Sequence, residues 1–257
     1  PAAKRRNIPV IMHLHDYKLF CPNHELFTQE QICYRCLGGH YGNCVKYRCL
    51  KNSRAKSLLA AAEMYIHHKI LDIYKKNLDL LIAPSEFMKA TAIRAGWPAE
   101  KVSVVYNFTD SVADSNPNKQ TDTKDYLLYF GRLSHEKGID FLLEALAELP
   151  EEHLKIVGDG PLAKQLQNLA EKLKLGQRVE FLGPKFGAEL DQIIREAKAL
   201  VFPSVWLENM PLTMLESLSR GKIMIVSKVG GMAEVISDGI NGFWSYPQQA
   251  VSIAKQV

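Results

Sequence analysis

Residues 126–160 read YLLYFGRLSHEKGIDFLLEALAELPEEHLKIVGDG, and this stretch decides the fold. Two short apolar runs, at 126–131 and 154–158, each end in glycine, and a helical apolar pattern at 141–149 lies between them. Short apolar strands joined through a helix are typical of a parallel sheet, because parallel strands need a long crossover connection. The stretch therefore predicts a βαβ unit.

The same rhythm continues toward the C-terminus. Further strands are expected at 179–183, 199–203, 222–227 and 242–246, alternating with helices at 162–173, 189–198, 211–219 and 232–237. Strands and helices that alternate with short connections predict an α/β fold with a doubly wound, mostly parallel sheet. Such sheets bind ligands at the carboxyl ends of their strands, so binding residues are expected in the loops that follow the strands.

The first 125 residues are less regular. Strands are expected at 8–15, 78–84 and 102–106, with a long helix at 53–76 and a short one at 86–95. Residues 110–125 are almost entirely polar, which is typical of a linker. We therefore expect two domains, at 1–112 and 125–257, joined by a linker at 113–124.

The composition is that of a folded globular protein. Of the 257 residues, 47% are hydrophobic and 23% are charged, which excludes the disordered and collagen-like classes. No apolar run reaches the ~20 residues that a membrane-spanning helix needs. The chain starts at Pro1 without a signal region and stops at Val257 within the expected start of a helix. We therefore expect a fragment of a longer cytoplasmic protein.

The net charge of +4 hides an uneven distribution. Residues 1–120 hold seven more basic than acidic side chains, whereas residues 121–257 hold three more acidic ones. Within 35–76, nine basic residues are accompanied only by Glu63 and Asp72. Such a segment attracts phosphorylated substrates or an anionic membrane surface, or it is a solvated helix face. We expect no nucleic-acid binding, because the sequence has no interleaved aromatic residues and no recognised module for it.

Two cations follow the expected strand at 126–131. Arg132 and Lys137 come after Gly131 in the loop GRLSHEKG. A guanidinium binds oxygens in pairs and an ammonium acts as a point charge, so together they suit a diphosphate. The next strand is followed by Gly158 and Gly160, in a turn that can admit a nucleotide. The alternative is that both segments are ordinary surface loops.

The segment SVWLENMPLTMLE (204–216) carries two carboxylates. Pro211 suits the first turn of a helix, so Glu208 precedes a helix start and Glu216 lies along the helix. A helix start offers N–H groups to an anion, and Thr213 adds a hydroxyl, so a phosphate can bind without a metal. If the segment is helical throughout, the carboxylates are about 12 Å apart, beyond the roughly 5–9.5 Å of a glycosidase pair. The binding of sugar hydroxyls fits the two carboxylates better. The alternative is that one glutamate caps the helix and the other is an ordinary solvated side chain.

All five cysteines occur between residues 16 and 52, where no helical or strand period is visible: Cys21, Cys33, Cys36, Cys44 and Cys49. Cys33 and Cys36 form a C-x2-C knuckle, which can hold a structural zinc ion together with two later cysteines. Because a reducing compartment disfavours disulfides, the alternative is free or transiently paired thiols. The sequence leaves both open.

Motifs in both halves resemble those of the retaining glycosyltransferases of family 4, which have the GT-B fold of two Rossmann-like domains. In the second half these are FGRLSHEKGID (130–140), VGDGP (157–161), VEFLGP (179–184), the E-x7-E pair of Glu208 and Glu216, and GGMAEVISDGINGF (230–243). In the first half they are HDYKLFCP (15–22) and LLIAPSEFMKATAIRAGWPAEKVSVVYNF (80–108). The resemblance implies a GT-B fold whose first domain is incomplete, because the family's glycine-rich first strand and loop would precede Pro1.

The resemblance also implies roles for single residues. Arg132 and Lys137 would neutralise the donor diphosphate, and His15 would face the sugar at the reaction centre. Glu208 would hold hydroxyls of the transferred sugar, and Glu216 those of the ribose. For His15 the alternative is a neutral structural imidazole. The other donor-binding residues would be Gly131, Gly158, Gly160, Asn209, Met210, Pro211, Leu212 and Thr213.

The implied activity is transfer of a sugar, with retention, from a UDP- or GDP-sugar to a glycan, lipid-linked or small-molecule acceptor. No metal or other cofactor would be required for catalysis, and the setting would be cell-surface or polysaccharide biosynthesis. A nucleotide-sugar epimerase of the same fold and a nucleotide-sugar-binding protein without activity are the alternatives. The basic segment 35–76 adds an expected peripheral contact with the inner face of a membrane.

Overall fold

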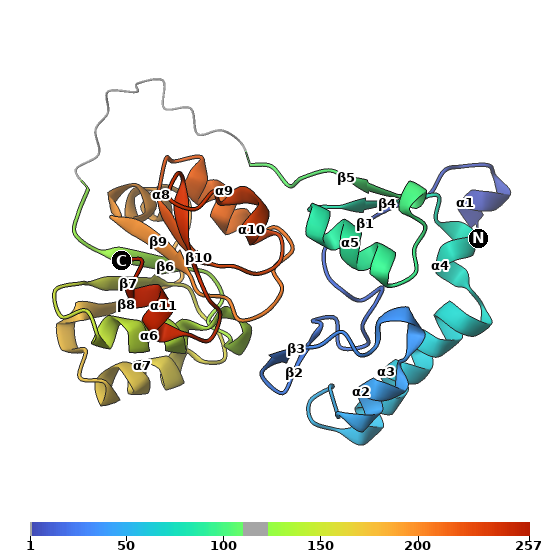
Figure 1. Cartoon of the computed structure of the whole chain (residues 1–257), viewed down its shortest axis with the longest axis horizontal. Coiled ribbons are helices and arrows are strands. Elements are labelled where there is room, and N and C mark those ends of the chain that lie inside the picture. The colour runs from blue at the N-terminus through green and yellow to red at the C-terminus, as the bar shows by residue number, and fades with distance from the viewer. Residues whose placement is uncertain (1, 110–122) are drawn as a thin grey trace. The chain divides into compact units, whose positions relative to one another are not determined.

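The computed structural model describes residues 2–109 and 123–257, and the chain divides into two compact units, Pro1–Asn107 and Phe108–Val257 (Figure 1). Each unit has its own parallel sheet with helices packed against it. The linker expected at 113–124 falls almost entirely outside the described residues. Among the residues that are described, no helix combines the length and the apolar character needed to span a bilayer.

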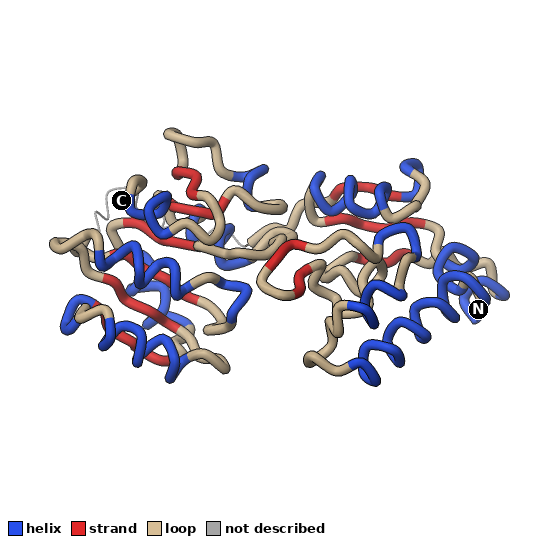
Figure 2. Tube along the Cα trace, turned by 60° about the horizontal axis from the view of Figure 1, so that its bottom comes forward, coloured by secondary structure: helices blue, strands red, loops and turns tan. Residues whose placement is uncertain are grey.

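The second unit is built on a six-stranded sheet with the order β11-β10-β9-β6-β7-β8, in which every pairing is parallel. Its strands are β6 (Leu127–Phe130), β7 (Leu154–Val157), β8 (Val179–Gly183), β9 (Ala199–Phe202), β10 (Met224–Ser227) and β11 (Gly242–Ser245). The residues of β6, β9 and β10 are all buried, because helices cover both faces of the sheet. Figure 2 shows this layering of strands between helices.

The helices of this unit lie on two faces. Figure 1 shows α6 (Ile139–Ala147), α7 (Ala163–Lys172) and α11 (Ala250–Ala254) on one side of the sheet. The other side carries α8 (Gly187–Glu196), α9 (Leu212–Leu218) and α10 (Met232–Val235). Short 3-10 turns lie at His135–Lys137 and Gly176–Arg178. The predicted doubly wound α/β fold is confirmed, and helix and strand ends differ from the expected ones by two residues or fewer.

The first unit has a three-stranded parallel sheet with the order β1-β4-β5. Its strands are β1 (Ile11–His13), β4 (Leu80–Ala83) and β5 (Val102–Val104), and α5 (Glu86–Arg94) follows β4. Ser85 caps α5 by accepting a hydrogen bond from the N–H of Met88 at 3.1 Å. The buried strand expected at 8–15 is shorter, and its Ile11 is exposed because β1 is at the edge of the described sheet.

The remaining elements of the first unit are short. They are α1 (Ala2–Arg5), the hairpin of β2 (Phe27–Thr28) and β3 (Gln31–Ile32), α2 (Gly42–Lys46), α3 (Arg54–Tyr65), α4 (Ile73–Asn77), a π-helical turn at Ile66–Ile70, and 3-10 turns at Leu37–Gly39 and Ala99–Lys101. The hairpin and α2 lie in the segment 16–52, where the sequence shows no period because elements this short leave none.

The prediction of a single helix at 53–76 is wrong. The segment breaks into α3, the π-helical turn and α4, because Asp72 has a left-handed backbone with a φ of 48° that a helix cannot include. The face of α3 that packs inward carries Ser57, Ala60, Ala61 and Met64. The larger apolar side chains of Leu58 and Leu59 instead face outward and are exposed.

Candidate functional site

Loops at the carboxyl ends of β6 and β9 meet at the centre of the second unit. β6 pairs with β7 on one side and with β9 on the other, so the strand order reverses between β6 and β9. Doubly wound sheets bind ligands in the crevice at such a reversal. The loop after β6 carries Arg132 and Lys137, and the loop after β9 carries Glu208. The structure therefore brings these three predicted residues to the position where this fold binds ligands.

Lys137 and Glu208 form an ion pair between the two loops. The Nζ of Lys137 lies 2.6 Å from Oε1 of Glu208, and the hydroxyl of Ser204 donates to the same oxygen at 2.8 Å. The Glu208 side chain is only 8% exposed. The Lys137 ammonium also lies 5.4 Å from the ring centre of Trp206. The carboxylate is thus fixed by two donors, while an ammonium has three donors and can still serve a ligand.

Two glycines after β10 hold the backbone of Glu208. The N–H of Gly231 donates to the carbonyl oxygen of Glu208 at 2.7 Å. Gly230 has a φ of 56°, and a Cβ there would lie 2.0 Å from that same oxygen. Glycine is required at 230 by its backbone conformation and by this close approach. Sequence reasoning missed this role, although both glycines stand in the motif 230–243.

The loop after β7 closes onto the loop after β6. A Cβ on Gly158, whose φ is 132°, would lie 1.9 Å from the carbonyl oxygen of Gly131. A Cβ on Gly160 would lie 2.3 Å from the carbonyl oxygen of Leu133, whose own N–H donates to the Asp159 carbonyl at 2.9 Å. The three predicted glycines are therefore explained by the packing of two loops. Their contact with a nucleotide stays a prediction.

Tyr129 supports the loop that carries Arg132. Its hydroxyl, which is buried beneath the loop, donates to the carbonyl oxygen of Arg132 at 2.9 Å. Burial, with smaller effects of Glu208 and Glu136, raises the pKa of Tyr129 well above its ordinary value, so the hydroxyl keeps its proton as a donor. The side chain of Arg132 itself is exposed and can reach a ligand. Tyr129 was not predicted as a site residue, because in the sequence it is one apolar position of a buried strand.

Helix α9 starts next to Glu208. Pro211 has extended backbone angles and immediately precedes the helix, and the N–H of Met214 donates to the Pro211 carbonyl at 3.1 Å. The N–H groups of Leu212 and Thr213 precede this bond and can serve an anion. Asn209 and Met210 belong to the loop before the helix. Because Glu208 lies outside the helix, the expected 12 Å separation from Glu216, which assumed a continuous helix, does not apply.

Glu216 lies half-buried on α9. Its carbonyl oxygen accepts hydrogen bonds from the Arg220 guanidinium at 2.6 Å and from the Ser219 hydroxyl at 2.9 Å. Arg220 in turn pairs with Asp191 of α8 at 2.7 Å, which ties α9 to its neighbour. These contacts are made by the carbonyl oxygen of Glu216 and fix its backbone. That its carboxylate binds a ligand stays a prediction.

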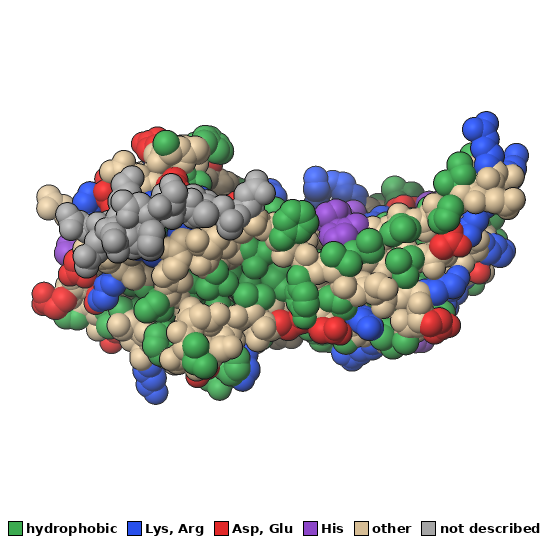
Figure 3. Space-filling model, turned by 90° about the horizontal axis from the view of Figure 1, so that it is seen from above, with side chains coloured by type: hydrophobic (Ala, Val, Ile, Leu, Met, Phe, Trp, Pro, Cys, Tyr) green, Lys and Arg blue, Asp and Glu red, His purple; other side chains and the backbone are tan. Residues whose placement is uncertain are grey.

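His15 lies in the first unit, two residues after β1. Its Nε2 is 3.2 Å from Nδ1 of His13, and the ring centres are 4.4 Å apart. Burial and the charge of His15 lower the pKa of His13. Histidine side chains form an exposed group on this unit in Figure 3. Because the two units are described separately, the structure does not bring His15 together with Lys137 and Glu208.

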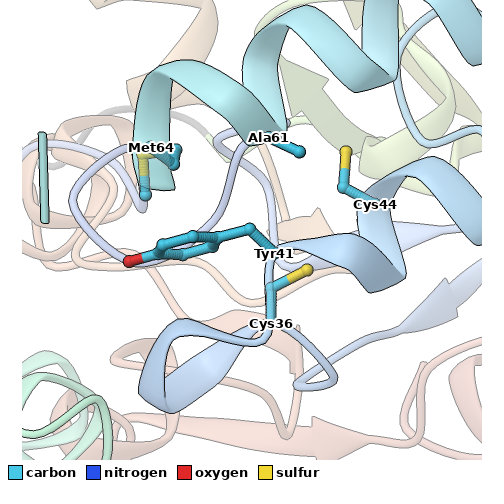
Figure 4. Close-up of a cluster of buried hydrophobic side chains, with 5 residues drawn as sticks. All are labelled: Cys36, Tyr41, Cys44, Ala61 and Met64. Carbon is cyan, nitrogen blue, oxygen red and sulfur yellow. The ribbon is translucent and has the colours of Figure 1, made fainter. Parts of the chain in front are cut away.

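The cysteines form no metal centre. All five are free, and the described residues, which include all of them, contain no group of three or more His, Cys, Asp or Glu side chains arranged to hold a metal ion. Figure 4 shows that Cys36 and Cys44 instead pack with Tyr41, Ala61 and Met64 in an apolar cluster. This arrangement gives no support to the zinc hypothesis, and zinc binding and free thiols both stay predictions.

Comparison with known proteins places the second half of the chain in one family. The family described as "Glycosyl transferases group 1" matches residues 111–257. An uncharacterized glycosyltransferase of Methanocaldococcus jannaschii is 32% identical over 172 residues, which cover 61% of this chain and 44% of that protein. The lipopolysaccharide 1,2-N-acetylglucosaminetransferase of Salmonella typhimurium is 29% identical over 210 residues, or 74% of this chain and 55% of that protein.

Solved structures show the same architecture. Anabaena HepE in complex with UDP and glucose has a TM-score of 0.68 at 23% identity, over 99% of this chain and 62% of that chain. The chain spans about half the length of the curated relatives it matches.

Proposed function

The chain belongs to the glycosyl transferases group 1 family, and from this premise we propose that it transfers a sugar with retention from a UDP- or GDP-sugar to an acceptor. It has the α/β architecture of the GT-B glycosyltransferases. The observation that carries the proposal is the Lys137–Glu208 pair at the strand reversal. It sets a cation suited to a diphosphate beside a carboxylate suited to sugar hydroxyls.

The donor diphosphate lies between the loops after β6 and β9 in this proposal. Arg132 is exposed and binds phosphate oxygens in pairs, and Lys137 adds a second cation that remains tied to Glu208. The N–H groups of Leu212 and Thr213 add neutral donors. As the bond to the sugar breaks, negative charge grows on the leaving phosphate, and these fixed donors stabilise it most in the transition state. The two cations supply this stabilisation without a metal.

The carboxylates orient the rest of the donor. Glu208 accepts hydrogen bonds from hydroxyls of the transferred sugar, and Glu216 from those of the ribose. Lys137 and Ser204 fix the Glu208 carboxylate before the donor arrives, which lowers the entropy cost of binding in a productive pose. His15 acts from the first unit at the sugar, and the leaving phosphate helps to deprotonate the acceptor hydroxyl. The sugar then keeps its configuration.

The acceptor is a glycan, a lipid-linked sugar or a small molecule, in cell-surface or polysaccharide biosynthesis. Residues 1–112 form the acceptor-side domain and residues 125–257 the donor-side domain, with a linker at 113–124. The enzymes of S. typhimurium and Schizosaccharomyces pombe that this chain resembles are named for lipopolysaccharide and phosphatidylinositol. These names support an acceptor anchored in a membrane. We propose that the reaction takes place at the cytoplasmic face of that membrane.

A membrane contact is proposed for the outward face of α3 and the π-helical turn. The apolar side chains on this face are exposed and recur at helical spacing: Leu58, Leu59, Tyr65, Ile66 and Ile70. The basic residues Arg54, Lys56 and Lys69 lie on the same segment and are exposed too. An apolar stripe flanked by cations suits the interface of an anionic membrane.

The test is donor binding and turnover with the full chain. We titrate UDP and GDP by calorimetry and assay a panel of nucleotide sugars for transfer and hydrolysis. Arg132→Ala should weaken the binding of the preferred nucleotide diphosphate about 10- to 100-fold, because a charge-assisted bidentate contact is lost. The control is Lys185→Ala, which removes a half-buried cation in the loop after β8, where Lys185 pairs with Glu189 of α8.

Two outcomes contradict the proposal. Equal affinity of the parent and of Arg132→Ala would remove the diphosphate assignment. Conversion of the donor into its epimer, with no transfer to any acceptor or to water, would assign the site to an epimerase instead.

A further inference from the structure

Cys44 and Cys49 are held side by side in the first unit. The N–H of Cys49 donates to the carbonyl oxygen of Cys44 at 3.1 Å, and the Cys44 thiol donates a hydrogen bond to the Cys49 sulfur. Cys44 is buried in the cluster of Figure 4, and Cys49 is a partly buried neighbour of that cluster. The pair therefore combines an inner sulfur with an outer one.

The surroundings of Cys49 favour a thiolate. The hydrogen bond from Cys44 is the largest influence, burial opposes it, and the Thr28 hydroxyl and the Arg35 charge support it, so the pKa of Cys49 falls to about 6. The same hydrogen bond raises the pKa of Cys44 strongly, because Cys44 supplies the shared proton. Cys49 is thus the nucleophile of the pair.

Cys49 also faces an open pocket. The pocket has a volume of about 650 Å³, and Cys49 lies in its wall together with Lys51, Lys56 and Leu59. Cys44 does not line it. A small reagent can therefore reach the outer sulfur first. Because Glu25 and Glu63 line the pocket beside the two lysines, its wall suits a reagent that carries both carboxylate and ammonium groups.

We propose that Cys49 is a reactive thiol site for small disulfides of the glutathione class, which carry both carboxylate and ammonium groups, and that Cys44 resolves the product into an intramolecular disulfide. In the first step the Cys49 thiolate attacks one sulfur of the reagent, a Cys49–reagent disulfide forms, and the other half leaves as a thiolate. The departing thiolate takes the proton that Cys44 no longer shares. In the second step the Cys44 thiolate attacks the Cys49 sulfur and releases the second half of the reagent as a thiolate, which takes a proton from solvent. The two cysteines are oxidised by two electrons, and the reagent is reduced to two thiols.

The experiment treats the full chain with glutathione disulfide and follows its intact mass without reductant, with peptide mapping of the product. The parent should pass through a glutathione adduct to a form lighter than the starting chain by two hydrogens, with residues 44 and 49 cross-linked. At about pH 6 the first step should be roughly tenfold faster than that of free cysteine, because more of Cys49 is thiolate although a thiolate of low pKa is a weaker nucleophile.

Variants separate the two sulfurs. Cys49→Ser should give neither the adduct nor the cross-link, and Cys44→Ala should stop at the adduct. Cys33→Ser is the matched control, since Cys33 is another partly exposed cysteine of the same segment, and it should behave like the parent. The proposal is overturned if Cys49→Ser reacts like the parent, if the cross-link joins other cysteines, or if native mass spectrometry finds a metal ion on the thiols.

Discussion

The Nζ of Lys137 and Oε1 of Glu208 lie 2.6 Å apart, although the two residues are 71 positions apart in the chain. One follows β6 and the other follows β9, so the pair bridges the two strands between which the sheet order reverses. Both side chains are largely withdrawn from water, with exposed fractions of 22% and 8%. The pair therefore links the stability of the second unit to the geometry of its candidate donor site.

Removing Lys137 should lower the free energy of unfolding more than neutralising Glu208 does. Lys137→Ala leaves a buried carboxylate with only the Ser204 donor, and we expect the free energy of unfolding to fall by about 3 kcal/mol. Glu208→Gln keeps a hydrogen-bonding side chain, so its free energy of unfolding should fall by less. Urea denaturation of both single variants and of the double variant measures this.

The double variant provides the decisive comparison. If an unpaired charge is the cause, adding Glu208→Gln to Lys137→Ala should recover part of the loss. A double variant whose loss equals the sum of the two single losses would mean that the two side chains do not interact.

Gly230 should tolerate no side chain. In Gly230→Ala the new Cβ would meet the Glu208 carbonyl oxygen at 2.0 Å, so the loops must separate and donor binding should be lost. Gly176→Ala is the matched control, because its φ of 55° is nearly the same as the 56° of Gly230 but no atom lies within 4 Å of its new Cβ. Thermal unfolding and nucleotide titration of both variants measure the difference.

The two glycine variants separate backbone strain from steric contact. Gly176→Ala should lower the free energy of unfolding by about 1–2 kcal/mol, which is the energy penalty of a left-handed backbone at alanine. Gly230→Ala should cost about 1–3 kcal/mol more, from the contact with Glu208. Equal losses would show that the loop after β10 does not position Glu208.

The sequence predicts the second unit well because local and global signals agree there. Each strand is a short apolar run, glycine ends the first three of them, and each intervening helix has an apolar face, so Leu127–Phe130 and Leu154–Val157 are found almost where they are expected. Lys137 and Glu208 are predictable as site residues, because the fold brings strand ends together. The direct contact between Lys137 and Glu208 cannot be predicted, since the sequence between Phe202 and Leu212 has no periodic pattern that would show the path of this loop.

The first unit resists prediction for a physical reason. In α3 the apolar stripe that usually marks a core face points outward, and small residues such as Ala60 and Ala61 face inward. A period of 3.6 residues locates the helix but does not say which of two moderately apolar faces is buried. The left-handed backbone of Asp72 leaves no clear signal either, since aspartate is common within helices and in turns.

Acid should destabilise the first unit through His68. Burial, with the charges of His67 and Lys75, lowers the pKa of His68 to about 4, and its ring lies 4.7 Å from that of Tyr74. An unfolded histidine has a pKa near 6.5, so between about pH 4 and 6.5 the unfolded state binds more protons than the folded state. Stability contributed by neutral His68 is therefore complete above this window and is lost as the pH falls through it.

A pH series of urea denaturations of the full chain measures this contribution. The parent should lose about 1–2 kcal/mol of this stability between pH 7 and pH 4, because His68 is only partly buried and solvent screens its charge, and His68→Gln should show a flatter profile. His153→Gln is the control, since His153 is an exposed histidine of the second unit. Identical slopes for the parent and His68→Gln would rule His68 out as the source.

Anionic vesicles should bind the first unit through α3. Leu59 is 73% exposed, so Leu59→Ser removes an apolar contact with the membrane while leaving the fold intact. The charge-reversing variant Lys56→Glu should weaken binding to vesicles rich in phosphatidylserine, and added salt should weaken binding of the parent, because the attraction between cations and headgroups is screened. The matched control is Ile240→Ser, which removes an even more exposed apolar side chain, 84% exposed, from the second unit.

Co-sedimentation with vesicles separates this surface from the alternatives. A membrane contact predicts that Leu59→Ser and Lys56→Glu each lower the bound fraction while Ile240→Ser does not. If the outward face of α3 instead joins two copies of the chain, the parent should be a dimer in sedimentation velocity, Leu59→Ser should be a monomer, and neither should bind vesicles. Because an apolar stripe alone serves either role, the dependence on anionic lipid is what distinguishes them: cations beside the stripe attract a negatively charged bilayer and repel their own copies.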